Sequence, residues 1–154
     1  MSVRTIVFVI AIVVVSALAP PASAQILEMS LSPRVVSFPS SDPDAVPIVA
    51  AAPVTITYRI RQNSGRPWSL TLLAGGDLIS GPDQIDISNV TWTATPAPPF
   101  QSGTLSKTVA QRIASGTGNV ANPSSGSVTF RLANPWTYST GTYTQTVVFT
   151  LSSP

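Results

Sequence analysis

Apolar and polar side chains alternate along several stretches of the chain. Over Val54 to Arg61 every second residue is apolar, so an extended chain would have one face for a core and one for water. The same pattern covers Ser127 to Arg131 and Tyr143 to Leu151, with Gln145 as an exception. Weaker runs are Leu27 to Leu31, Val35 to Phe38, Trp68 to Leu73, Ile85 to Thr95 and Thr104 to Ile113. These runs predict about eight strands and no helix.

Gly, Pro, Ser and Asn separate the strand-like runs. Short strands punctuated in this way are typical of an all-β fold, and we predict an immunoglobulin-like antiparallel β-sandwich. Pro39 to Pro53 is rich in Pro and Ala, which predicts an extended crossover between the two sheets. Ser115 to Gly126 carries turn-forming residues and is expected to be a mobile loop.

The first 24 residues have the pattern of a cleaved signal peptide. Arg4 provides a positive start, Thr5 to Leu18 an uncharged apolar run, and Ala22-Ser23-Ala24 a small-residue cleavage site. The apolar run is shorter than the ~20 residues of a spanning helix. We therefore expect cleavage between Ala24 and Gln25, no membrane span in the mature chain, and a secreted or envelope-associated, extracytoplasmic protein. Residues 25–154 are enough for a single domain.

Composition narrows the possible chemistry. The chain has eight basic and six acidic residues, and the arginines are scattered, so nothing predicts nucleic-acid binding. It has no cysteine and no histidine, which removes the commonest metal ligands, the commonest general base and the usual nucleophile pairs. Asp77, Asp83 and Asp86 are interpreted as turn residues, because their spacing fits neither a calcium loop nor a carboxylate pair. We predict no enzymatic activity, no catalytic residue, no metal site and no cofactor.

Aromatic residues are the candidate binding groups. Exposed rings bind sugars by stacking, and the segment NPWTYSTG places Trp136 and Tyr138 in a Pro- and Gly-bounded connection. Trp92 is a further candidate. For Trp92 and for Trp68, burial in the core is the competing interpretation.

Two stretches resemble the WxL domains of exported bacterial surface proteins. Trp68-Ser69-Leu70 is a W-x-L triplet, and the closing segment STGTYTQTVVFTLSSP is similar to the final strand of that domain, with Phe149-Thr150-Leu151 in place of the second triplet. The resemblance covers Val54 to Pro154. It implies a β-rich module that attaches non-covalently to the cell wall, with peptidoglycan or another envelope glycan as the ligand. Trp68, Leu70, Phe149 and Leu151 would then belong to the motif and lie in the core.

Two other classes of function stay open. The closing strand is also similar to that of fimbrial and coat-like subunits, which assemble with other surface proteins by adding a strand to a sheet edge. Gln25 to Ser32 is a candidate donor strand for such assembly, or else the first strand of its own sandwich. A free carbohydrate-binding module is the second alternative.

Overall fold

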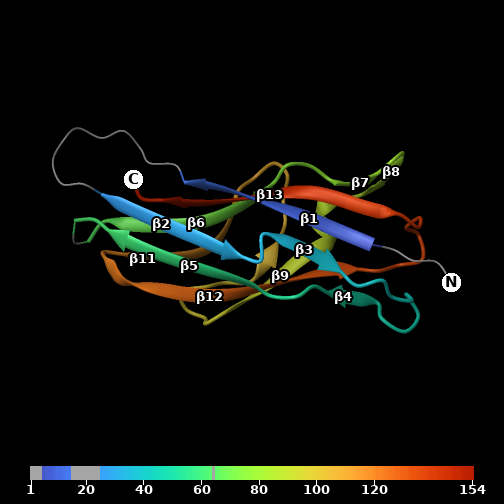
Figure 1. Ribbon diagram of the computed structural model, residues 1–154, viewed down its shortest axis with the longest axis horizontal. Coiled ribbons are helices and arrows are strands. Elements are labelled where there is room, and N and C mark those ends of the chain that lie inside the picture. The colour runs from blue at the N-terminus through green and yellow to red at the C-terminus, as the bar shows by residue number, and fades with distance from the viewer. Residues whose placement is uncertain (1–4, 15–24, 64) are drawn as a thin grey trace.

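The chain folds into two β-sheets that pack face to face (Figure 1). The structure, a computed structural model, describes residues 5–14, 25–63 and 65–154. The first sheet has the strand order β11 (Gln111–Thr117), β6 (Pro67–Ala74), β13 (Thr142–Ser152), β1 (Thr5–Val14) and β3 (Val35–Phe38). The hairpin of β7 (Leu78–Ser80) and β8 (Asp83–Ile85) joins this sheet by the pairing of β7 with β13. The second has the order β10 (Gly103–Thr104), β9 (Val90–Thr95), β12 (Val120–Ala133), β5 (Val54–Arg61), β2 (Ile26–Ser32), with β4 (Ile48–Ala50) beside β12. The predicted all-β sandwich is confirmed.

Alternation of side chains explains the strands that face the core. In β5 the apolar residues Val54, Ile56, Tyr58 and Ile60 are all buried, and the residues between them are exposed or half-buried. The first and last residues of β5 and of β3 agree with the sequence prediction. A strand with one apolar face buries that face against a second sheet, so these patterns give the sandwich its core.

Aromatic rings from both sheets meet in the interior. Trp68 of β6 lies 5.2 Å, between ring centroids, from Tyr58 of β5, and Tyr58 lies 6.0 Å from Phe100 in an edge-to-face arrangement. Because β6 and β5 belong to different sheets, the Trp68–Tyr58 contact joins the two layers.

Three glycines leave space for large rings. Gly116 pairs with Trp68 across β11 and β6, and Gly103 pairs with Trp92 across β10 and β9. A methyl group on Gly116 would lie 2.7 Å from the Trp68 ring, and one on Gly103 would lie 2.6 Å from the Trp92 ring. Gly126 of β12 faces the Phe100 ring in the same way. Each glycine is therefore part of the core packing.

Two predicted strands are interrupted. The run from Ile85 to Thr95 contains a short 3-10 turn, η1 (Ile87–Asn89), because the Asp86 carboxylate accepts the Ser88 backbone N–H at 2.8 Å. An aspartate that binds backbone two residues further on favours a turn over a strand. The run from Thr104 to Ile113 is split between β10 and β11, so it is not one strand.

The segment from Ser115 to Gly126 is mostly strand, which corrects the prediction of a mobile loop, and its turn takes the chain from the first sheet to the second. It contains the end of β11, a turn at Gly118 with φ +76°, and the start of β12. The Asn119 side chain accepts the Gln62 backbone N–H at 2.6 Å and so fixes the turn to the end of β5. Backbone pairing with β5 holds the first half of β12, whose side chains are mostly exposed and show no apolar alternation.

The segment from Pro39 to Pro53 crosses from one sheet to the other, as predicted. It begins after β3 of the first sheet and reaches the second sheet at β4, which pairs with the end of β12. A turn at Asp42 and the Asn134 side chain, which donates to the Val46 carbonyl at 3.0 Å, hold the intervening residues.

Candidate functional site

A slot between β13 and β3 is the main feature with a bearing on function. The backbone of β1 fills it, pairing with β13 in parallel over ten residues and with β3 antiparallel over four (Figure 1). The other strand pairings among the described residues are antiparallel. Within the described part of the chain β3 pairs with β1 alone, so β1 is what connects β3 to the rest of its sheet.

The strands that flank the slot are mainly apolar on the face that points into the core. Phe149 and Leu151 of β13 are completely buried, and Val36 and Phe38 of β3 are at most 2% exposed. The other residues of β13 on this inward face are Tyr143, Val147 and the half-buried Gln145. If the strand in the slot were removed, these apolar side chains would become accessible, and the edges of β13 and β3 would lose their backbone partners.

The strand that fills the slot lies entirely inside the predicted signal peptide. β1 spans Thr5–Val14, whereas cleavage is predicted after Ala24. Ala24 lies outside the described residues, and Gln25 directly precedes β2. Sequence reasoning assigned the apolar run to export alone and missed its pairing. The signal was present, since a continuous apolar run is also typical of a strand buried on both faces.

The residues of the WxL-like triplets lie side by side in the first sheet. Leu151 pairs with Leu70, and the next pair on the same face of the sheet joins Phe149 to Leu72. Trp68, Leu70, Phe149 and Leu151 are all at most 5% exposed. They build the core, and Phe149 and Leu151 also line the slot.

The three candidate sugar-binding aromatics do not form one exposed surface. Trp92 is 2% exposed and its indole N–H donates to the Gln101 carbonyl at 2.9 Å, so of its two interpretations burial holds. Tyr138 is half-buried; this burial, and secondarily the negative charge of Asp86, raises the pKa of its hydroxyl. Trp136 is 64% exposed, and its indole N–H donates to Asp44 at 2.8 Å. Trp136 is thus the candidate whose ring faces solvent.

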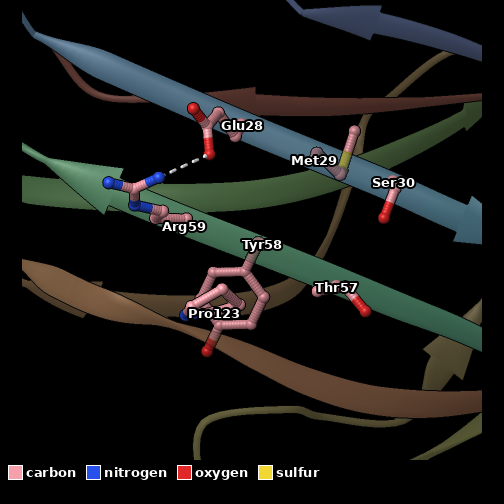
Figure 2. A pocket seen from close by; sticks show the side chains of 7 residues that line it. All are labelled: Glu28, Met29, Ser30, Thr57, Tyr58, Arg59 and Pro123. Atoms are coloured by element: carbon pink, nitrogen blue, oxygen red, sulfur yellow. Dashed lines mark hydrogen bonds and ion pairs between the residues drawn. The ribbon is translucent and has the colours of Figure 1, made fainter.

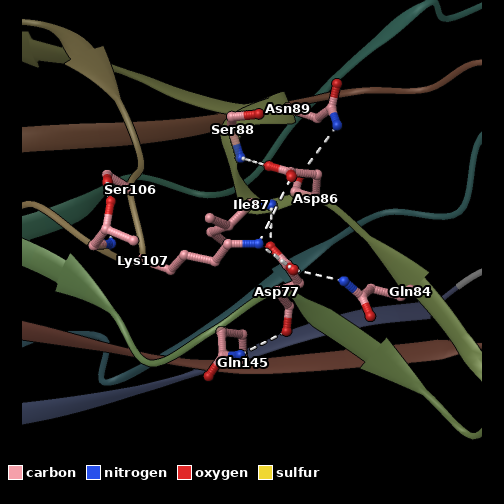
Figure 3. Close-up of polar contacts among 10 residues, drawn as sticks. Asp77, Gln84, Asp86, Ile87, Ser88, Asn89, Ser106, Lys107 and Gln145 are labelled. Carbon is pink, nitrogen blue, oxygen red and sulfur yellow. Dashed lines mark hydrogen bonds and ion pairs between the residues drawn. The ribbon is translucent and has the colours of Figure 1, made fainter.

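The aspartates near the β7–β8 hairpin have a structural arrangement (Figure 3). Lys107 Nζ lies 2.5 Å from an Asp77 carboxylate oxygen and 3.7 Å from Asp86. Asp77 also accepts the Ile87 backbone N–H at 3.0 Å. Gln145, the exception in the alternation of β13, donates to the Asp77 carbonyl at 2.6 Å. This network connects the hairpin to β13 and to the segment before β11.

We expect the Asp77 carboxylate to stabilise the fold in a pH-dependent way. Its hydrogen bond to Lys107, followed by that from Ile87, lowers its pKa below 3.8 in the folded state. The stabilisation is then complete above the unfolded-state pKa of 3.8 and is lost as the pH falls through the lower folded-state pKa. Urea midpoints of wild type and Asp77→Asn should differ at pH 7 and converge below that window. A difference that is constant with pH would contradict this role, and Asp83→Asn serves as the control.

A shallow depression of about 260 Å³ lies on the second sheet, between β2, β5 and β12 (Figure 2). It opens where the pairing of β12 with β5 shifts register between Val120 and Ser124. Arg59 pairs there with Glu28 at 3.3 Å, and its buried Nε has no hydrogen-bond partner. The depression contains one ion pair and no convergent set of catalytic groups.

Metal-ligand clusters, membrane-spanning helices and similarity to known proteins are the other features that bear on function. In residues 5–14, 25–63 and 65–154 no three His, Cys, Asp or Glu side chains are grouped as metal ligands would be. No helix in the described residues is long and apolar enough to cross a membrane. No protein-family model matches the chain, and no curated protein sequence matches it either.

Proposed function

We propose that the mature protein is an exported, non-catalytic surface subunit that completes its sandwich by accepting a strand from another polypeptide. The observation that supports this is the position of β1, which fills the slot between β13 and β3 from within the predicted signal peptide. Removal of the leader would leave a domain that lacks one strand in the middle of a sheet.

The physical consequences of that loss favour a partner strand. Ten paired positions of β13 and four of β3 would lose their neighbouring strand, alternate residues along them would lose backbone hydrogen-bond partners, and buried apolar residues would become accessible. An exposed, apolar edge is a template for strand addition, and strand addition satisfies the backbone groups and the apolar surface together. The absence of histidine and cysteine is in keeping with a binding role.

The experiment uses the full chain with a specific protease site placed between Ala24 and Gln25. The freshly cleaved protein should stay folded because the released segment stays bound, and its unfolding midpoint, unlike that of the intact protein, should depend on protein concentration. After the segment has been removed in denaturant and the protein has been returned to buffer, we expect the midpoint and the near-UV signal of the aromatic core to be lost.

Addition of a peptide tests the slot directly. A peptide with the sequence of Thr5–Val14 and lysines at both ends should restore the midpoint, which should keep rising with the logarithm of the peptide concentration. A peptide with serine at every second position is the matched control, since it keeps the backbone but removes the apolar side chains of one face. A mature chain that refolds with the original midpoint and does not respond to either peptide would refute the proposal.

Attachment to an envelope glycan is a second candidate, favoured by the exposed indole of Trp136 beside Asp44. An aromatic ring that faces solvent next to a hydrogen-bonding carboxylate is a suitable surface for a sugar ring. The strand-completed protein should then sediment with peptidoglycan sacculi and not with cellulose or chitin, and Trp136→Ala should abolish this. Equal sedimentation of the variant would eliminate Trp136 as the binding residue.

A further inference from the structure

The first strand after the predicted cleavage site is already part of its own sandwich. β2 pairs with β5 over seven residues, and Glu28 forms an ion pair with Arg59 across the two strands. Gln25, the first residue after the cleavage site, lies within 3.5 Å of Gln62 and of the Ser153 carbonyl. The candidate donor segment from Gln25 to Ser32 is therefore occupied in the second sheet.

Release of β2 to a second copy would give no net gain in pairing. Leu27, Met29 and Leu31 pair with Ile60, Tyr58 and Ile56 of β5, all three of which are buried. A copy that donated β2 would fill one slot and open the β5 edge of its own second sheet. The exchange exposes a surface of the same kind as the one it covers, so nothing drives it.

The pattern of β2 also fits the slot poorly. The slot offers ten paired positions along β13, whereas β2 has seven residues, and Glu28, Ser30 and Ser32 alternate with its apolar positions. By contrast, the sequence of Thr5–Val14 is apolar at each position except Thr5. Two long connections, 39–47 and 134–141, offer no substitute, since the first is rich in Pro, Ser and Asp and the second in Thr, Ser and other polar residues.

We infer that the strand that enters the slot comes from a different polypeptide, so that the mature chain accepts a strand and donates none. This inference rests on the proposed function and names its partner. The partner presents an extended segment of about ten apolar residues, a length set by the strand pairing, that runs parallel to β13 and antiparallel to β3. A subunit that accepts a strand and donates none would be the last member of a series of subunits joined by strand exchange.

Light scattering after size-exclusion chromatography, across a range of protein concentrations, tests whether the mature chain donates a strand to a second copy of itself. The cleaved, leader-free chain should form no discrete oligomer, and addition of the lysine-flanked Thr5–Val14 peptide should yield a folded monomer with one bound peptide. Discrete oligomers of the leader-free chain that the peptide converts to monomers would overturn the inference but uphold the slot. A leader-free chain that is a stable folded monomer with no peptide response would overturn the proposed function itself.

Cross-linking tests the direction of the added strand. The chain has no cysteine, so single introduced cysteines give unambiguous disulfides. In the parallel register, the peptide residue that corresponds to Val7 pairs with Thr144, and the one that corresponds to Val13 pairs with Thr150. Thr144→Cys should therefore link to a peptide with cysteine in place of Val7, and Thr150→Cys to one with cysteine in place of Val13. Links in the opposite combination would overturn the inferred polarity.

Discussion

Replacement of Trp68 by alanine should lower the free energy of unfolding of the full chain by about 3–5 kcal/mol, the usual cost of emptying a buried site for a large aromatic side chain. Trp68 is 5% exposed and joins the two sheets through its contact with Tyr58, with ring centroids 5.2 Å apart. Gly116 of β11, which pairs with Trp68, leaves the space that the indole fills. Alanine at this position would leave a cavity between the Tyr58 ring and the backbone of β11.

Urea unfolding followed by tryptophan fluorescence and circular dichroism measures this change. Trp136→Ala is the matched control, because it removes the same side chain from a position that is 64% exposed. We expect the control to stay within about 0.5 kcal/mol of wild type, as is usual for surface substitutions. Equal midpoints for Trp68→Ala and wild type would show that Trp68 does not support the core, and the W-x-L triplet would then have to be explained by binding.

Local patterns in the sequence determine how much of this fold could be predicted. β3 and β5 were predicted with their bounds because a period of two between apolar and polar residues is a property of the strand alone. The turn at Ile87–Asn89 was missed because Asp86 binds a backbone N–H that the alternation pattern does not register. The strands within Ser115 to Gly126 were missed because they are held by backbone pairing, to β6 and to β5, and carry mainly polar side chains.

The slot could not be derived from local patterns. It depends on a pairing between Thr5–Val14 and Thr142–Leu151, which lie at opposite ends of the chain, and register between distant strands leaves no trace in either segment. The apolar run also matches two physical requirements at once, since a signal peptide and a strand buried on both faces both need continuous hydrophobicity. Of the candidate surface residues, the Pro- and Gly-bounded setting of Trp136 pointed to its exposure, while Trp92, in an alternating strand, is buried.

Phe100 and Gly126 should show a strong energetic coupling, which is the second large effect we expect. Phe100 is 2% exposed and lies against Tyr58, Ala114 and Gly126, so it contacts strands of both sheets. Phe100→Ala should lower the free energy of unfolding by about 3–5 kcal/mol. Gly126→Ala should lower it by about 1–3 kcal/mol, because the added methyl group would overlap the Phe100 ring.

The double variant distinguishes packing from backbone effects. Once Phe100 is alanine, a methyl group on residue 126 enters vacated space, so Phe100→Ala with Gly126→Ala should be more stable than the sum of the single losses implies. Gly141→Ala, whose methyl group would face Ser80, is the control, and its effect should add to that of Phe100→Ala within about 0.5 kcal/mol. Strict additivity for Gly126 would mean that alanine is unfavourable there for reasons of backbone conformation. A positive coupling would instead assign the cost to the ring, and would show that glycine in this strand is required by the side chain opposite it.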